Sequence, residues 1–179
     1  PKKIKDGDTV CVISPSSSAK TFQKSRLDNA IKNVKKVLGL NTVWSKNAFE
    51  FNKATQSSSI KSRINDLHNA FKDKNINIIS CARGGFNIND LLPYIDWNIV
   101  KNNPKIICGY SDITALANAI YTKIGIVTYI GPNFSTFGIQ KQSNYTFDFF
   151  KQCVMTTNPI QIIPSLKWGQ KDGEKFNNK

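Results

Sequence analysis

The stretch "PKIICGYSDITAL" (residues 104–116) contains a buried strand, a sharp turn and the start of a helix. Residues 106–108 form an apolar run that ends at Gly109, as expected of a strand covered on both faces. From Ile113 onward, apolar residues recur at helical spacing. Ser111 stands between the two patterns, on a predicted strand-to-helix turn. A strand joined directly to a helix is the repeating unit of α/β folds.

The same unit recurs along the chain in both directions from this stretch. Apolar, β-branched runs predict strands at 8–14, 41–45, 75–82, 104–110 and 126–130, with a further possible strand at 160–164. Helical spacing predicts helices at 21–38, 60–71, 88–95 (short, and broken near Pro93), 113–124 and 145–155. This alternation predicts a three-layer α/β/α fold with a mostly parallel sheet, flavodoxin-like or glutamine-amidotransferase-like.

Composition favours an ordinary globular chain. It has 179 residues, of which 40% are hydrophobic and 21% charged, enough for one substantial core. No apolar run approaches the ~18 residues that a membrane span requires, so we expect no membrane partner. No cysteine pair has the C-x-x-C spacing, and the one histidine is His68, so we expect no metal site and no cofactor. Free, mostly buried thiols in a reducing compartment are predicted at Cys11, Cys81, Cys108 and Cys153.

The net charge of +13 raises the question of a nucleic-acid partner. The lysines are scattered, however, and those at 32, 35 and 36 fall on the polar face of one predicted helix. The sequence contains no aromatic-basic alternation and no known nucleic-acid motif. A solvated lysine-rich surface is therefore the favoured interpretation, with no nucleic-acid partner. A basic nucleic-acid-associated module stays as an alternative.

Three loops leave the carboxyl ends of predicted strands: 14–18, 83–87 and 109–112. In open parallel sheets, binding sites form beyond that edge. The sequence has neither the G-x-x-x-x-G-K-[ST] nor the G-x-G-x-x-G phosphate-binding pattern. The double glycine Gly84-Gly85 has two open interpretations. It is either a turn that needs glycine or a backbone that approaches a ligand and directs N–H groups at an anion.

Ser111 also has two compatible interpretations. A serine before a helix is a good N-cap. A serine on a strained strand-to-helix turn is also the arrangement of a nucleophile elbow, in which the following N–H, here that of Asp112, points at the developing oxyanion. The elbow pattern is G-x-S-x-G, and this chain has Ile113 where the second glycine would stand.

An ordered set of segments resembles one known family. "GDTVCVISPSS", "RGGFNINDLLPYIDW", "NNPKIICGYSDITAL" and "YIGPNFSTFG" occur in that order and resemble the amino-terminal domain of the LD-carboxypeptidase family, which includes the microcin C immunity peptidases. The resemblance covers about residues 6 to 168. It implies a cytoplasmic hydrolase that cuts an amide bond at the carboxyl end of a peptide. In peptidoglycan recycling that bond leads to a terminal D-alanine of a muropeptide, and in the immunity members it joins an aspartyl group to an aminoacyl-nucleotide mimic.

The resemblance also implies roles for individual residues. Ser111 becomes the nucleophile, and the backbone N–H groups of Gly85 and Asp112 become the oxyanion hole. The family completes its triad with a glutamate and a histidine from a carboxy-terminal domain. His68 lies within a predicted helix, beside its apolar stripe, and is expected to be structural. We therefore expect the chain alone to be inactive.

The remaining expectations concern domains, substrate and partners. Residues 1–165 are predicted to form the nucleophile-bearing domain, and 166–179 to begin a linker to a carboxy-terminal domain. Arg83 and Gly84 are candidate substrate-binding residues, Arg83 through a bidentate contact with a terminal carboxylate. Equally, Arg83 could stabilise its own loop. A muropeptide is the preferred substrate, a peptidyl-nucleotide the alternative, and a homodimer is possible. A non-catalytic binding domain of the same fold is a further alternative.

Overall fold

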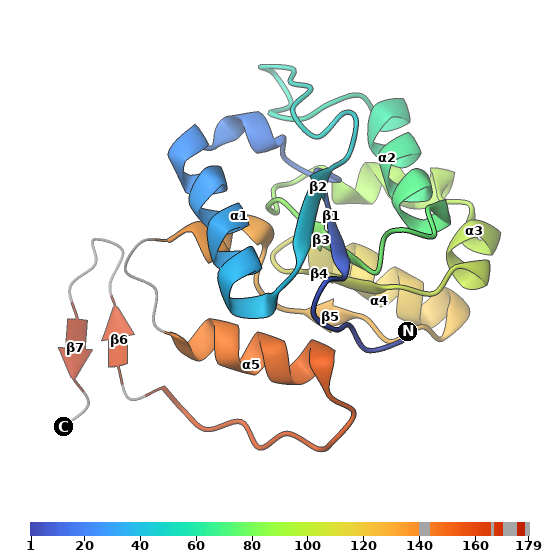
Figure 1. The fold of residues 1–179 in the computed structure, drawn as a ribbon. Helices are drawn as coiled ribbons and strands as arrows, with labels where there is room; N and C mark the ends of the chain where they lie inside the picture. Colours follow the sequence, from blue (N-terminus) through green and yellow to red (C-terminus); the bar gives the residue numbers. More distant parts are fainter. Residues whose placement is uncertain (140–143, 166, 170–174, 178–179) are drawn as a thin grey trace.

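The computed structural model describes residues 1–139, 144–165, 167–169 and 175–177, and its centre is a five-stranded sheet. All neighbouring strands of this sheet are parallel, in the order β2-β1-β3-β4-β5 (Figure 1). The strands are β1 (Thr9–Ile13), β2 (Asn41–Trp44), β3 (Ile78–Cys81), β4 (Ile106–Gly109) and β5 (Tyr129–Ile130). The predicted parallel α/β sheet is confirmed, and its strand order is that of flavodoxin-like folds.

Helices cover both faces of the sheet, which makes three layers (Figure 1). They are α1 (Lys24–Leu38), α2 (Ile60–Lys72), α3 (Trp97–Asn102), α4 (Ile113–Ile124) and α5 (Asn144–Met155). One apolar cluster joins the sheet to α1 and α5, and the other joins it to α2, α3 and α4. Because both faces are covered, the inner strands β1, β3 and β4 are buried along nearly their whole length, whereas the edge strand β2 alternates between exposed and half-buried residues.

Successive residues of one strand enter different clusters. On β1, Val10 and Val12 pack on the α1 side, whereas Cys11 and Ile13 pack on the α2 side. The α1 side also contains Phe134, from a short 3-10 helix, η3 (Phe134–Gly138). Helices therefore pack on both faces of the sheet. The loops at its carboxyl edge begin from strands that are held in place by this packing.

Two predicted elements differ from the structure. Residues 88–95 do not form an α-helix but a 3-10 helix, η2 (Ile88–Tyr94), with Pro93 inside it. Proline lacks the N–H that an α-helical turn needs. The possible strand at 160–164 is wrong, because no strand is present there.

Some elements were not predicted. Asp96 is the N-cap of helix α3, and its side chain accepts hydrogen bonds from the N–H groups of Asn98 and Ile99. A short 3-10 helix, η1 (Ala19–Thr21), precedes α1. Beyond residue 165 the structure describes two short antiparallel strands, β6 (Lys167–Gly169) and β7 (Lys175–Asn177). The rest of the predicted linker, at 166, 170–174 and 178–179, lies outside the described residues.

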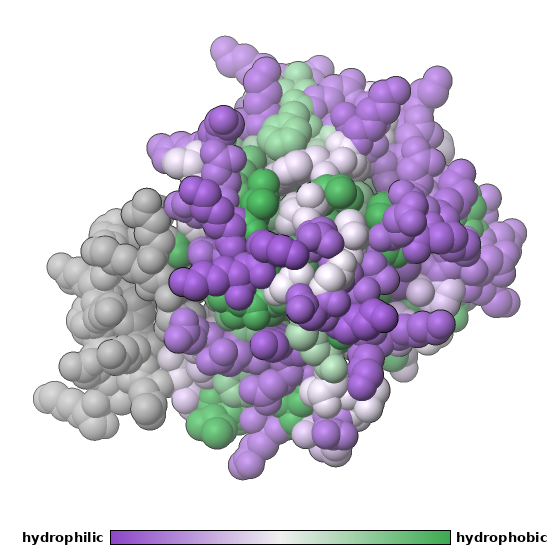
Figure 2. Space-filling view, viewed as in Figure 1, coloured by the Kyte–Doolittle hydropathy of each residue, from purple (hydrophilic) through white to green (hydrophobic). Residues whose placement is uncertain are grey.

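The cysteines behave as predicted in their burial and pairing. All are free, Cys11, Cys81 and Cys108 are buried, and Cys153 is partly buried. Burial raises the pKa of Cys108 to about 12, which keeps it a neutral thiol. Within the described residues, no helix is long and apolar enough to cross a bilayer. The face seen in Figure 2 is largely hydrophilic, with apolar patches scattered between.

Candidate active site

Ser111 sits on a strained turn between β4 and α4. Its φ angle is 70°, and Gln56 is the only other non-glycine residue with positive φ in the described part of the chain. A side chain in this left-handed region costs roughly 1–2 kcal/mol. The structure places the helix N-cap at Asp112, and the Ser111 hydroxyl makes no hydrogen bond within the described residues. The cap interpretation is therefore wrong, and the hydroxyl is left free.

Gly84 lies directly against this turn. A Cβ atom added to Gly84 would stand 2.6 Å from Ser111 Cβ and 3.0 Å from Ser111 Oγ, distances too short for any side chain. The first glycine of the double glycine is thus required by close approach to Ser111. The structure brings the β3 and β4 loops together, as expected for loops that leave the same edge of a parallel sheet.

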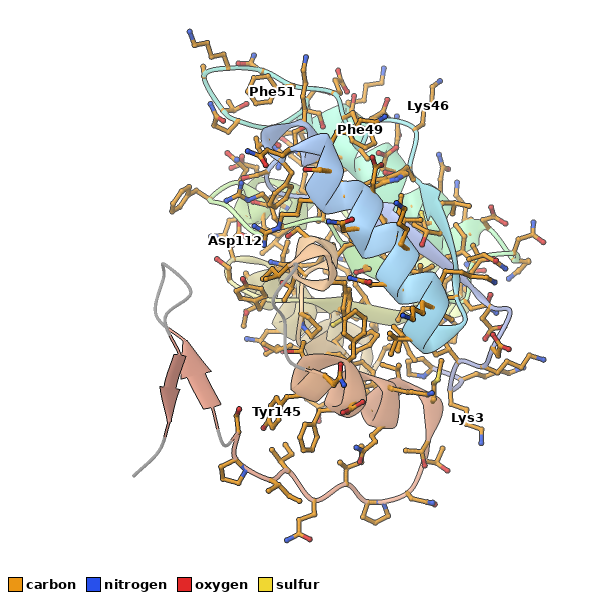
Figure 3. The ribbon with its side chains drawn as sticks, turned by 60° about the vertical axis from the view of Figure 1, so that its left-hand side comes forward. Lys3, Lys46, Phe49, Phe51, Asp112 and Tyr145 are labelled. Atoms are coloured by element: carbon orange, nitrogen blue, oxygen red, sulfur yellow. The ribbon has the colours of Figure 1, made fainter. Side chains whose placement is uncertain are left out.

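The Asp112 side chain ties three loops together. Its carboxylate accepts hydrogen bonds from Gly85 N at 2.7 Å, Ser16 Oγ at 2.5 Å and Ile88 N at 3.3 Å. Ser16 belongs to the loop after β1, and Gly85 and Ile88 belong to the segment after β3. Figure 3 shows Asp112 on the side of the molecule away from Lys3, which precedes β1. One carboxylate thus fixes the loops at the carboxyl edge.

These contacts refine the expected oxyanion hole. The N–H of Asp112 has no acceptor within the described residues and is free to donate to a substrate oxygen. The N–H of Gly85 is already donated to the Asp112 carboxylate. Gly85 therefore lies at the expected loop, but it can serve as the second donor only if it exchanges this carboxylate for a substrate oxygen.

A buried arginine also binds the loops after β1 and β3 through hydrogen bonds to their backbone. Arg63, on α2, is 4% exposed and donates from Nη1 to Pro15 O (3.1 Å) and Asn87 O (2.8 Å). It also pairs with Asp90, at 3.6 Å. Burial lowers the pKa of Arg63, and the nearby Asp90 charge opposes that shift.

Arg63 was not among the residues predicted for the site, although the sequence contains a signal for it. Ile60, Ile64 and Leu67 form the apolar stripe of the helix, and Arg63 shares that stripe at the i+3 position from Ile60. A charged residue on a buried stripe must find partners inside the protein.

The pocket at Ser111 has a volume of about 320 Å³ and contains two arginines. Its lining residues are Phe22, Arg26, Arg83, Gly84, Gly85, Phe86, Tyr110, Ser111, Asn133 and Ser135. Arg83 lies there as expected, and it donates to Thr21 Oγ1 at 3.1 Å rather than to a carbonyl of its own loop. Arg26, from the first turn of α1, was not anticipated. Among the residues that the structure describes, no carboxylate and no histidine line this pocket.

His68 is remote from the pocket and has a structural contact. Its Nε2 accepts a hydrogen bond from Asp96 N, at the start of α3, at 3.0 Å. Burial lowers the pKa of His68, with Asp96 opposing and Lys72 reinforcing that shift. An imidazole that accepts at Nε2 is neutral and occupied, so His68 does not act on Ser111.

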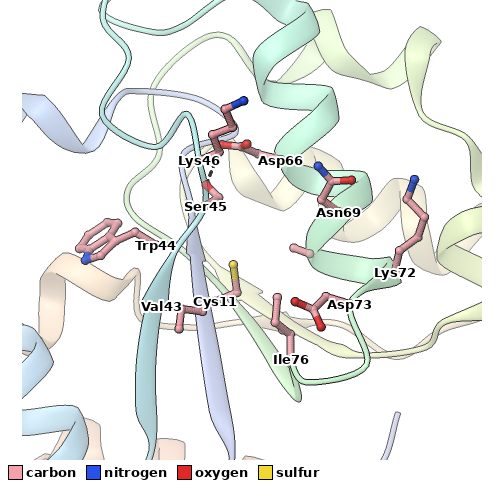
Figure 4. Close-up of a pocket in the computed structure, with 11 residues that line it drawn as sticks. Cys11, Val43, Trp44, Ser45, Lys46, Asp66, Asn69, Lys72, Asp73 and Ile76 are labelled. Carbon is pink, nitrogen blue, oxygen red and sulfur yellow. Dashed lines mark hydrogen bonds between the residues drawn. The ribbon is translucent and has the colours of Figure 1, made fainter.

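A larger cavity, of about 560 Å³, lies between β2 and α2 (Figure 4). The Asp66 carboxylate in it accepts hydrogen bonds from Ser45 Oγ at 2.7 Å and from the backbone and side-chain nitrogens of Asn47. Burial raises the pKa of Cys11, the thiol that lines it, to about 12. The Asp66 carboxylate is satisfied and the Cys11 thiol is neutral, so neither group supplies an activated nucleophile in this cavity.

Comparison with known proteins agrees with this geometry. Residues 10–131 match the model of the LD-carboxypeptidase N-terminal domain, Peptidase_S66. The chain is 45% identical over 166 residues to "Putative carboxypeptidase YocD" of Bacillus subtilis (strain 168), which covers 93% of this chain and 50% of that protein. It is 35% identical over 180 residues to "Probable murein peptide carboxypeptidase" of the same organism, covering 97% of this chain and 55% of that protein.

The solved structure of an MccF-like protein from Bacillus anthracis str. Ames superposes with a TM-score of 0.95 at 44% identity, over 100% of this chain and 56% of that chain. The chain thus spans about half the length of these three relatives. The matched segment contains the Ser111 turn, the double glycine and the loop after β1. The chain therefore belongs to the LD-carboxypeptidase family, and it corresponds to that family's amino-terminal domain.

Proposed function

We propose that this chain is the nucleophile-bearing domain of a serine peptidase that hydrolyses the amide bond to the last residue of a peptide. The observation that carries the proposal is the Ser111 turn. A strained serine, whose hydroxyl makes no hydrogen bond among the described residues, lines a pocket at the carboxyl edge of the sheet. Strain of this kind persists where it serves a function. In a nucleophile elbow it projects the hydroxyl over the sheet edge.

Four chain positions have roles in the proposed reaction. Ser111 Oγ attacks the scissile carbonyl, and the free N–H of Asp112 stabilises the oxyanion that forms. Gly85 is the proposed second donor, once its N–H leaves the Asp112 carboxylate. Gly84 lets the loop after β3 approach Ser111, because a Cβ atom at this position would clash with the serine side chain.

A general base must come from outside the described pocket. A serine hydroxyl is a poor nucleophile until a neighbouring group takes its proton, and no histidine or carboxylate of the described residues lines this pocket. We propose that a glutamate and a histidine of a carboxy-terminal domain complete the triad. Residues 1–165 would form the nucleophile domain and 166–179 the start of the connection to the second one. From family resemblance alone, we further propose a cytoplasmic, homodimeric full-length enzyme.

The preferred substrate is a muropeptide that ends in D-alanine. A relative of similar sequence is named as a murein peptide carboxypeptidase, which supports this choice. The alternative is an immunity peptidase that cleaves an aminoacyl-nucleotide mimic, supported by the likeness to an MccF-like structure. Cleavage of an aminoacyl-sulfamoyl adenylate, with none of the muropeptide, would favour the alternative.

The test compares the full-length protein, its Ser111→Ala variant and residues 1–179 alone, each incubated with a muropeptide. We expect the full-length protein to release D-alanine, and Ser111→Ala to lower turnover by at least about a thousandfold. The isolated chain should fold but show no turnover. Ser25→Ala, which removes an exposed serine of α1, is the matched control and should retain normal turnover. Normal turnover by Ser111→Ala would refute the proposed nucleophile.

A further inference from the structure

Two arginines of the Ser111 pocket share one aromatic ring. The guanidinium carbon of Arg83 lies 4.8 Å from the ring centroid of Phe22, and that of Arg26 lies 5.3 Å from the same centroid. The two cations come from different parts of the chain, the β3 loop and the first turn of α1. Phe22 therefore holds two positive groups together at one wall of the pocket.

Neither guanidinium has an acidic partner in the described part of the chain. The single ion pair found among the described residues joins Arg63 and Asp90, away from these two arginines. Arg26 donates one hydrogen bond, from Nε to Ser135 O at 2.9 Å, and Arg83 donates one to Thr21 Oγ1. Asp112 is the nearby carboxylate of the turn, and its oxygens accept from Ser16, Gly85 and Ile88 instead.

Like charges held together raise the free energy of the empty pocket, and an anion placed between them would lower it. Each guanidinium has five N–H donors, so most donors of both arginines stay available for a ligand. Planar guanidinium groups bind carboxylates through paired hydrogen bonds. The pocket is also small, about 320 Å³, so an anion bound there lies close to Ser111.

From this arrangement we infer that Arg26 and Arg83 form a subsite for the free carboxylate of the substrate's last residue. The inference rests on the proposed function and specifies its selectivity. In a peptide cut before its last residue, the terminal carboxylate follows the scissile bond by one residue, within about 4 Å of chain. The arginines would then select peptides with a free carboxyl end. Phe22 positions both guanidinium groups without touching the substrate's reacting atoms.

The test uses the full-length protein and two matched muropeptides, one with a free terminal carboxylate and one with a terminal carboxamide. We expect the wild type to prefer the free acid in kcat/KM. Arg26→Gln and Arg83→Gln should each lower that preference by about tenfold or more, the value of a charge-assisted hydrogen bond. Lys24→Gln is the matched control, since it removes an equal charge from the same turn of α1 but lies outside the pocket lining. It should keep the wild-type preference.

Binding to the Ser111→Ala protein, measured by calorimetry, gives a second readout that needs no turnover. The free acid should bind more tightly than the carboxamide, and Arg26→Gln added to this background should remove the difference. An unchanged acid preference in both arginine variants would overturn the inference while leaving Ser111-dependent cleavage intact. If the two arginine variants lost activity only toward an aminoacyl-sulfamoyl adenylate, the assignment of the subsite to a terminal carboxylate would be overturned. Loss of Ser111 dependence would instead count against the proposed function.

Discussion

The carboxyl edge of the sheet contains arginines in two contrasting environments. Arg63 is buried behind the loops, donates to Pro15 O and Asn87 O and pairs with Asp90. Arg83 is partly exposed, rests on an aromatic ring and has no carboxylate partner among the described residues. The protein supplies two carbonyl acceptors and a counter-ion to Arg63, and only its buried Nε has no hydrogen-bond partner among the described residues, whereas the proposed partner of Arg83 is a ligand. Residue type alone does not separate these roles, because only the surrounding acceptors distinguish structure from function.

The largest stability effect should come from Arg63→Met. This substitution leaves Pro15 O and Asn87 O without their donor, so we expect the free energy of unfolding to fall by about 3 kcal/mol. Arg83→Met is the contrasting control and should cost no more than about 1 kcal/mol, because it removes one contact with Thr21 and one with Phe22. Urea denaturation of both variants measures the difference. Equal losses would erase the contrast between the two arginines.

Asp112→Ala should have the next largest effect. It removes the acceptor of Ser16, Gly85 and Ile88 and leaves the three loops untied, at a cost of about 2 kcal/mol. Asp148, exposed on α5, provides the control, since Asp148→Ala should change stability by less than about 0.5 kcal/mol. Thermal denaturation compares the two variants. If both melt like the wild type, Asp112 does not hold the loops.

Backbone strain at Ser111 predicts an unusual order of stability. Because its φ is 70°, Ser111→Gly should be more stable than Ser111→Ala by about 1 kcal/mol. Ser25, in the first turn of α1, should show the reverse order, with alanine above glycine, since glycine weakens a helix. Denaturant titration of the four variants checks both signs. Alanine above glycine at position 111 would argue against a strained turn.

The smallest effect concerns pH. The pKa of His68 is lowered in the folded state, so the unfolded chain binds more protons as pH falls through about 6.5. Stability from neutral His68 is therefore present above that pH and is lost progressively toward the folded pKa. We expect His68→Gln, which keeps an acceptor but does not titrate, to flatten the melting temperature between pH 7.5 and 5.5. A variant as pH-sensitive as the wild type would exclude this contribution.

Much of the architecture followed from local pattern. Apolar runs and helical spacing predicted the five parallel strands, both covering layers and the meeting of the loops after β3 and β4. The helix α3 was not predicted because it is short and depends on the cap at Asp96. The predicted strand at 160–164 was wrong because an apolar run forms a strand only where another strand can pair with it.

Local sequence patterns were enough to predict the α/β class and the sheet edge where a site would form, and the family resemblance predicted that Ser111 and Gly84-Gly85 share that site. The tertiary structure alone decided the strained φ of Ser111, the capture of the Gly85 N–H by Asp112, and the meeting of Arg26 with Arg83 on Phe22. The physical reason is range. Strands and helices follow from residues a few positions apart, whereas these contacts join loops that are distant in sequence and meet only when the parallel sheet aligns the ends of its strands.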